Sequence, residues 1–329
     1  MKPPRDGPRE TSPRRTAAVS RREAGLRLDL FLVGAFPGLS RKQAKRLVDS
    51  RQVSVDGRIE HMASRVLRSG QHIDVSLPER RERPAPPAIA VLYEDDQCLA
   101  IRKPPGLASG PTRDPDRAHA ARLAEELSGR PLTLLHRIDK ETSGVLLLAK
   151  TADFADALTR AFRQRTVQKT YLALIRGSPP AEFEVVSHLS EGEGGRMHLV
   201  RSGGVRAETR FSTLAERGGY ALVEARPRTG RTHQIRVQLA QSGHPILGDS
   251  LYGGEASVKS HPVPRQMLHA WSLAFYHPGA GREVRVEDPP PEDFLEVARL
   301  IFGAKLPPAL AHSAGIARPP LGCPPVQGA

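Results

Sequence analysis

A charged, proline-rich stretch at residues 79–88 divides the chain into two parts that are expected to fold separately. Its sequence, ERRERPAPPA, contains no large apolar side chain, and its prolines are typical of a semi-rigid linker. The 329 residues also exceed the usual size of one domain. We therefore expect a small domain at 25–78 and a larger one at 89–305. The ends, 1–24 and 306–329, are rich in proline and poor in large apolar residues, which predicts disorder.

The charge of the chain limits its possible partners. A net charge of +13 and a pI near 10.3 favour binding to polyanions, with a nucleic acid and a membrane surface as the two candidates. No apolar stretch approaches the roughly 20 residues that cross a bilayer, and the N-terminus lacks the apolar core of a signal peptide. Two cysteines cannot form a disulfide framework or a cysteine-based zinc site. We expect a cytoplasmic, monomeric protein that binds a nucleic acid and no membrane.

Residues 25–78 predict a small α/β module. An apolar segment ends near Pro37, and Ser40 with Gln43 has the spacing of a capping box that opens a second helix. An alternating segment then reaches Asp56-Gly57, which is a hairpin signal. The second helix has an apolar face and a face with two like-charged pairs at i and i+4, formed by Arg41, Lys42, Lys45 and Arg46. Such pairs cost stability, which suggests a ligand-binding face, although a solvated charged face is the commoner meaning of this pattern.

The larger domain predicts an α+β fold. Residues 89–101 indicate two strands around an acidic turn. Strands and helices follow without regular alternation, which favours a mixed, largely antiparallel sheet over a doubly wound parallel one. The expected strands are at 145–149, 170–175, 208–214, 220–226 and 234–239, and the expected helices are near 118–128, 152–163 and 292–302.

A candidate active site precedes the apolar run at 145–149. Residues 136–144 read HRIDKETSG, so that Asp139 lies between cations and is followed by turn-forming residues. The apolar run is short enough to be a buried strand, which would hold the preceding loop at a rigid edge of the sheet. From the pattern alone, Asp139 could equally cap a turn and pair with Arg137 or Lys140.

The motifs resemble those of the RluA-type pseudouridine synthase family. The segment HRIDKETSG is similar to the family signature, and three further blocks occur in the family's order: KPPGL at 103–107, QKTYLA at 168–173, and GRTHQIR at 230–236 followed by GHPILGD at 243–249. Together they cover about residues 89–278. The order of elements in 25–78, with SRKQA opening the second helix, resembles an S-four-like RNA-binding module.

The resemblance implies a role for four residues in a cleft along a mixed sheet. Asp139 corresponds to the catalytic residue, and Arg137 to the arginine that enters the RNA. Tyr171 would lie against a uracil flipped out of the helix, although a strand tyrosine alone more often packs in a core. Arg236 would pair with Asp139 and keep it ionised, with Arg231 as the nearest rival for that pairing. The partner implied is RNA, with large-subunit ribosomal RNA favoured over tRNA.

The expected reaction needs no cofactor. Isomerising a uridine breaks a bond from ribose to a ring nitrogen and forms one to a ring carbon, without net oxidation. A carboxylate can add to or stabilise the electron-poor centre, or remove a sugar proton, and the sequence leaves these routes open. His136 and His233 lack the spacing of a zinc motif, so we expect no metal site and assign neither to catalysis. Residues 243–249 lack the ending of a phosphate loop and predict a turn that shapes the cleft.

Two departures from the family pattern and two rival functions remain. Gln238 stands where a histidine is usual, and residues 107–112 replace the more usual Val-His-Pro wording. These departures bear on substrate choice and leave the four implied site residues intact. A non-catalytic RNA-binding or ribosome-assembly factor would not need Asp139, Tyr171 and Arg236 together. A glycosidase usually needs two opposed carboxylates, and only one embedded candidate is present.

Overall fold

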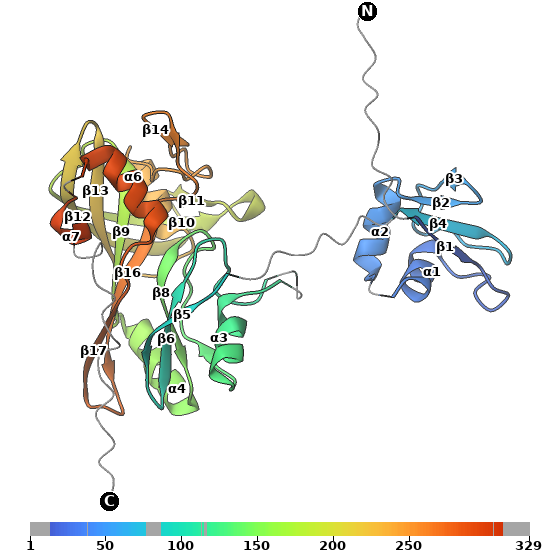
Figure 1. Ribbon diagram of the computed structural model, residues 1–329, viewed down its shortest axis with the longest axis horizontal. Coiled ribbons are helices and arrows are strands. Elements are labelled where there is room, and N and C mark those ends of the chain that lie inside the picture. Colours follow the sequence, from blue (N-terminus) through green and yellow to red (C-terminus); the bar gives the residue numbers. More distant parts are fainter. Residues whose placement is uncertain are drawn as a thin grey trace, which may run out of the picture. The chain divides into compact units, whose positions relative to one another are not determined.

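The chain folds into two compact units, Met1–Ala85 and Pro86–Ala329, in a computed structural model (Figure 1). The structure describes residues 14–37, 39–76, 87–112, 114, 117–304 and 306–311. The predicted linker at 79–88 spans the boundary between the units, and its residues 79–86 lie outside the described part. Over the described residues, no helix has both the length and the apolar character needed to cross a membrane.

The small unit is a four-stranded antiparallel sheet with two helices. Its strands pair in the order β1-β4-β2-β3. The predicted capping box is confirmed, because the Ser40 hydroxyl accepts from the Gln43 backbone N–H while the Gln43 side chain accepts from the Ser40 N–H. The predicted hairpin joins β2 to β3. The elements are β1 (Arg14–Ala18), α1 (Leu28–Ala35), α2 (Arg41–Asp49), β2 (Val53–Val55), β3 (Arg58–Ile59) and β4 (His72–Ser76).

The small unit begins earlier than the sequence predicted. Residues 1–24 were expected to be disordered, yet β1 lies within this range and pairs along its whole length with β4. Main-chain hydrogen bonds hold β1, helped by a hydrogen bond from the Thr16 hydroxyl to Asp74 and by the buried side chain of Val19. Because backbone pairing needs no large apolar side chains, the composition of this segment concealed the strand.

The large unit is built on one mixed sheet of eleven strands. They pair in the order β11-β10-β12-β13-β9-β16-β8-β6-β5, with β17 added to β16 and β7 added to β8. Only β8 and β16 pair in parallel, so the predicted mixed, largely antiparallel α+β fold is confirmed. The strands are β5 (Ala90–Glu94), β6 (Cys98–Lys103), β7 (Thr133–Leu134), β8 (Ser143–Ala149), β9 (Gln168–Arg176), β10 (Glu182–Glu191), β11 (Met197–Val200), β12 (Val205–Arg217), β13 (Tyr220–Pro227), β16 (Leu268–His277) and β17 (Arg282–Glu287).

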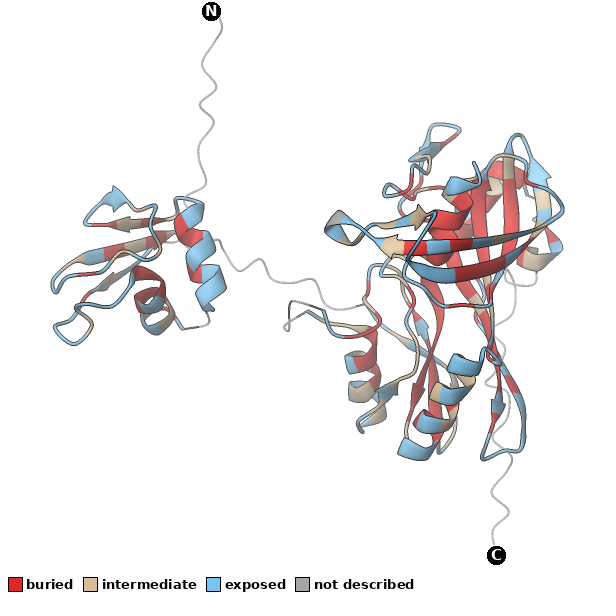
Figure 2. Ribbon diagram, turned by 180° about the vertical axis from the view of Figure 1, so that it is seen from behind, coloured by how far each residue is buried: buried red, intermediate tan, exposed pale blue. Residues whose placement is uncertain are grey.

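Helices bury the apolar faces of this sheet. The side chain of Thr151 caps the N-terminus of α4, and Phe154 and Leu158 of that helix pack into the core on β8 and β16. Helix α6 packs against the core at the other end of the sheet through Phe294 and Ile301. Figure 2 shows the buried residues, in red, concentrated in the strands of the large sheet. The helices are α3 (Ala120–Ser128), α4 (Ala152–Gln164), α5 (Gln234–Gln241), α6 (Glu292–Phe302) and α7 (Pro308–Ala311), with a 3-10 turn at Glu193–Gly195 and a small hairpin of β14 (Ser257–Val258) and β15 (His261–Pro262).

The expected strand at 234–239 is wrong, because these residues form helix α5. Polar and apolar residues alternate there as in a half-exposed strand, but all six side chains are buried. Their polar groups have buried partners; Gln238, for example, accepts from the Thr209 hydroxyl and donates to the Ser187 hydroxyl. A helix buried on every side loses the polar face on which periodicity depends. Gln238 thus ties α5 to β10 and β12.

The C-terminal boundary also differs from the expectation. Residues 306–329 were predicted to be disordered, but Leu306 and Leu310 pack against the large core, and α7 lies in this range. Residues 312–329 lie outside the described part. Two leucines among repeated prolines are enough to anchor a single helical turn.

Candidate active site

The loop that carries Asp139 leads directly into the most buried strand of the sheet. All seven residues of β8 are buried between β16 and β6, so the position of Ser143 is fixed. The loop ends in a turn, in which the Thr142 N–H donates to the Asp139 carbonyl oxygen at 3.1 Å. The structure therefore holds the loop at an edge of the sheet, as the sequence predicted.

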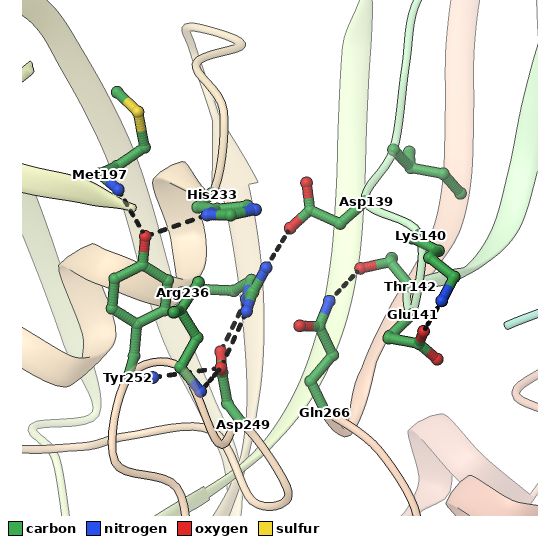
Figure 3. A network of polar contacts seen from close by, with 12 residues as sticks. Asp139, Lys140, Glu141, Thr142, Met197, His233, Arg236, Asp249, Tyr252 and Gln266 are labelled. Atoms are coloured by element: carbon green, nitrogen blue, oxygen red, sulfur yellow. Dashed lines mark hydrogen bonds and ion pairs between the residues drawn. The ribbon is translucent and has the colours of Figure 1, made fainter. Parts of the chain in front are cut away.

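Asp139 faces Arg236, which lies 97 positions later in the chain (Figure 3). The Arg236 Nη1 donates to the Asp139 Oδ2 at 3.1 Å, with the two side chains 9% and 23% exposed. Arg236 lies in the first turn of α5. Asp139 thus pairs with neither Arg137 nor Lys140, and Lys140 pairs with Glu141 instead. The carboxylate keeps one side open to solvent beside a cation.

A second carboxylate fixes Arg236 from behind. Asp249 accepts two hydrogen bonds from the guanidinium, at 2.7 Å to Nε and 2.9 Å to Nη2. The guanidinium also lies over the ring of Tyr252, with its central carbon 5.1 Å from the ring centroid. Burial opposes the charge of Arg236, but the hydrogen bonds to Asp249 and the charge of Asp139 raise the pKa of its guanidinium. Arg236 is therefore a permanent cation in a fixed orientation.

The next layer supports Tyr252. Its hydroxyl accepts from the Met197 N–H at 3.0 Å and lies 3.0 Å from the His233 Nδ1 (Figure 3). His233 precedes α5 in a left-handed conformation, with φ of 53°. Burial lowers the pKa of the His233 imidazole, against the nearby charge of Asp139. His233 is therefore a neutral group that holds the Tyr252 ring on which the Arg236 guanidinium lies.

Tyr171 lies on β9 and contacts two of the buried apolar clusters of the large unit. Burial and the charge of Asp139 raise the pKa of its phenol, so the ring is apolar in its surroundings and close to the carboxylate. No hydrogen bond joins its hydroxyl to another side chain among the described residues. The structure thus brings Asp139 and Arg236 into contact, and it places Tyr171 within electrostatic reach of Asp139.

Arg137 lies two residues before Asp139 and is exposed. It forms no hydrogen bond or ion pair with any other residue that the structure describes. The rival Arg231 donates to the Arg206 carbonyl oxygen at 3.3 Å and does not contact Asp139. Arg137 is therefore the cation of the loop that remains available to a ligand.

The four cations of α2 differ in their surroundings. Arg41 donates to Asp29 at 3.0 Å, and Asp29 is buried. Lys42, Lys45 and Arg46 are exposed and have no ion pair within the described part of the chain. Arg41, Lys42 and Lys45 line a groove of about 610 Å³ in the small unit, together with Arg27, Asp29, Asp49 and residues 61–64. Arg41 thus has a structural partner, whereas the two lysines are available to a polyanion.

The sequence analysis missed Asp249 and Tyr252 as parts of the site. It treated residues 243–249 only as a turn, whereas the last residue of that block supplies the carboxylate that holds Arg236. The turn itself is real: Gly248 has φ of 75°, and an added Cβ would lie 1.9 Å from the Arg265 carbonyl oxygen. The Gly-Asp pair at 248–249 was the available sequence signal for Asp249, because a glycine in a constrained turn fixes the position of the next side chain.

His136 is partly buried and His269 is fully buried in the same unit, and both are neutral. The His136 Nε2 accepts from the Leu147 N–H at 3.0 Å, and His269 bridges the Ser143 hydroxyl and the Asp288 carbonyl oxygen. Burial lowers the pKa of each imidazole to about 3. Through these bonds both imidazoles stabilise the start or the middle of β8.

These two histidines predict acid sensitivity of the large unit. Their folded pKa of about 3 lies below the ordinary 6.5, so between these values the unfolded chain binds more protons and stability falls as pH falls. Each should remove about 1.4 kcal/mol per pH unit in the middle of this window. The change His136→Gln should reduce the slope by that amount. Urea unfolding followed by the fluorescence of Trp271, the only tryptophan in the chain, measures it between pH 7 and 4.5. Equal slopes of stability against pH for the wild type and His136→Gln would show that folding does not lower the pKa of His136.

Comparison with known proteins agrees with this geometry. The family described as RNA pseudouridylate synthase matches residues 97–241, and the S4 domain matches residues 26–73. The ribosomal large subunit pseudouridine synthase D of Neisseria meningitidis serogroup A is 32% identical over 321 residues, covering 89% of this chain and 84% of that protein. The synthase C of Pasteurella multocida is 35% identical over 296 residues, covering 82% and 89%.

A solved structure shows the same relationship. The human RNA pseudouridylate synthase domain containing 4 is 30% identical, with a TM-score of 0.53, and the match covers 64% of this chain and 92% of that one. The fold, the order of the motifs and these relatives agree. The chain belongs to the RluA-type family of RNA pseudouridine synthases and carries an S4 domain before its catalytic domain.

Proposed function

We propose that this pseudouridine synthase acts on uridines in large-subunit ribosomal RNA and that Asp139 is its catalytic residue. The contact that carries the proposal is the 3.1 Å ion pair between Asp139 and Arg236, because it orients a carboxylate that is 23% exposed against a buried cation. Asp249 is not a second catalytic carboxylate, since it is 1% exposed and both its oxygens bind Arg236. This arrangement disfavours a glycosidase mechanism.

The reaction asks three things of this site. A uridine inside a helix must be extruded, and Arg137, exposed beside the site, can fill the space left in the stack. Tyr171 offers an aromatic face to the extruded uracil. Asp139 then acts on the ribose or the ring, either as a nucleophile or as a base. Both routes use the carboxylate that Arg236 holds at 3.1 Å.

Two observations support ribosomal RNA as the substrate. Relatives that match more than four fifths of this chain are named as ribosomal large subunit synthases. The S4 domain presents a cationic groove, and a second groove of about 340 Å³ in the large unit is lined by Arg165, Lys169, Arg226, Arg228 and Arg285 among others. We place the reaction in the cytoplasm and expect a monomer to suffice, because a single chain supplies every residue proposed here.

The activity can be tested on purified components. Large-subunit ribosomal RNA transcribed with uridine tritiated at C5 should release tritium, because the new bond to ribose forms at that carbon. A tRNA pool labelled in the same way is the control substrate. Release from ribosomal RNA and not from tRNA is expected. Release from tRNA alone would contradict the proposed substrate, and release from neither would contradict the activity.

The groove of the small unit makes a separate prediction. In the double variant Lys42→Gln/Lys45→Gln, the slope of log affinity against log salt should fall by up to nearly two units, since each phosphate contact contributes somewhat less than one. Binding titrations at several salt concentrations measure the slope. The matched control is Arg58→Gln/Arg68→Gln, which removes the same charge from exposed positions outside the groove. Equal slopes for both variants would show that the groove makes no specific phosphate contact.

A further inference from the structure

Buried polar side chains from other segments hold the Asp139 loop at four positions, 138, 140, 141 and 142. The contacting residues come from two segments, one formed by the last residue of β6 and the loop after it, and one preceding β16. Their contacts are Ser109 with Ile138, Lys103 with the Lys140 carbonyl oxygen, Arg265 with the Glu141 carbonyl oxygen, and Gln266 with the Thr142 hydroxyl. The reaction described above uses none of these side chains directly.

Ser109 makes the contact nearest to Asp139. Its Oγ donates to the Ile138 carbonyl oxygen at 2.7 Å and accepts from the Ile138 N–H at 3.1 Å. One hydroxyl therefore satisfies both backbone groups of the residue immediately before Asp139. Ser109 is 2% exposed and Ile138 is 7% exposed, so water does not compete for these bonds.

Lys103 holds the other neighbour of Asp139. Its ammonium is fully buried and donates to the carbonyl oxygens of Lys140, Leu107 and Pro104, at 3.0, 2.8 and 2.9 Å. Three acceptors match the three donors of an ammonium, and they hold the amine although burial lowers its pKa to about 7. The segment at 103–109 thus contacts backbone groups of both residues that flank Asp139.

This segment is itself rigidly placed. The N–H groups of Ala120 and Ala121, at the start of α3, donate to the carbonyl oxygens of Ala108 and Ser109 at 2.8 and 3.1 Å. At Gly110 an added Cβ would lie 2.9 Å from the Leu134 side chain. The position of the Ser109 hydroxyl is therefore fixed by the fold before substrate arrives.

We propose that Ser109 is a positioning residue for the isomerisation. With Lys103 it fixes backbone groups of the two residues that flank Asp139, so that the Asp139 carboxylate meets Arg236 and the ribose in one orientation. The inference rests on the proposed role of Asp139. The proposal gives a function to a residue within 107–112, where the sequence differs from the usual family sequence. A displacement of about 1 Å at a reacting group can lower the rate about 100-fold. Loss of the Ser109 hydrogen bonds should therefore affect turnover more than RNA binding.

The variant Ser109→Ala tests this, since it removes one buried oxygen and adds no bulk. Its kcat should fall by about 10- to 100-fold, while KM and the affinity for RNA change less than about threefold. Single-turnover rates and binding are measured well below the unfolding temperature. The control is Thr151→Ala, which removes the N-cap of α4 beyond the far end of β8 and should lower Tm without lowering kcat.

Each outcome decides the question. A kcat for Ser109→Ala within twofold of the control would overturn the positioning role, and so would equal losses in both variants, which would reflect stability alone. Asp139→Asn is assayed alongside them. If Asp139→Asn retains activity, the proposed catalytic role fails; if it is inactive while Ser109→Ala is unaffected, only the positioning role fails.

Discussion

The change Asp139→Asn should reduce isomerisation by at least about 1,000-fold while leaving RNA affinity within about threefold of the wild type. The substitution is isosteric, and the amide oxygen can still accept the hydrogen bond that Arg236 Nη1 donates at 3.1 Å. It removes only the negative charge, which either chemical route requires. Single-turnover tritium release at saturating protein measures the rate, and a filter-binding titration measures the affinity.

The neighbouring change Glu141→Gln is the matched control. Glu141 lies in the same loop and pairs with exposed Lys140, and its side chain does not contact Arg236. It should keep activity within a few-fold of the wild type. Turnover by Asp139→Asn at a similar level would show that the chemistry does not depend on this carboxylate.

Removing the partner of Asp139 should have the second largest effect. Arg236→Ala should lower kcat by about 100-fold and cost about 3 kcal/mol of stability, because Asp249 is left buried without its partner. Without the guanidinium, Asp139 also loses the hydrogen bond that Arg236 donates to its carboxylate at 3.1 Å. Single-turnover tritium release measures the rate, and urea unfolding measures the stability.

The control for this pairing is Arg231→Ala. Arg231 lies on the same segment, and its side chain hydrogen-bonds only to the Arg206 carbonyl oxygen among the described residues. Arg231→Ala should leave kcat within a few-fold of the wild type, and the kcat of Arg236→Lys should fall between those of the wild type and Arg236→Ala. A loss of kcat in Arg231→Ala and not in Arg236→Ala would show that Arg231 is the charge partner of Asp139.

The pairing of Asp139 with Arg236 shows what the sequence could predict about the site. Asp139 and Arg236 each belong to a motif that the sequence shows. The continuous apolar run after Asp139 correctly predicted a buried strand, which holds the preceding carboxylate in place. Their contact joins positions 97 residues apart, which local patterns do not encode. The family resemblance supplied that pairing. Asp249 and Tyr252 were missed because a turn signal in their segment concealed the buried carboxylate and ring.

Helix α5 and strand β1 show where sequence patterns misled the fold prediction. The alternation in α5 resembled a strand because its polar residues, Gln234, Arg236 and Gln238, are buried with specific partners. Strand β1 is held by main-chain bonds to β4, so its composition suggested disorder. Where an apolar face or a capping box decided the structure, as in α2, the prediction was confirmed.

The most direct test maps pseudouridines in large-subunit ribosomal RNA from three strains: one with this gene, one without it, and one in which Asp139→Asn is the only copy. We expect one or more positions to be modified in the first strain and unmodified in the other two, with equal amounts of protein in the first and third. Modification that persists in the Asp139→Asn strain, or ribosomal RNA that is identical in all three, would contradict the account.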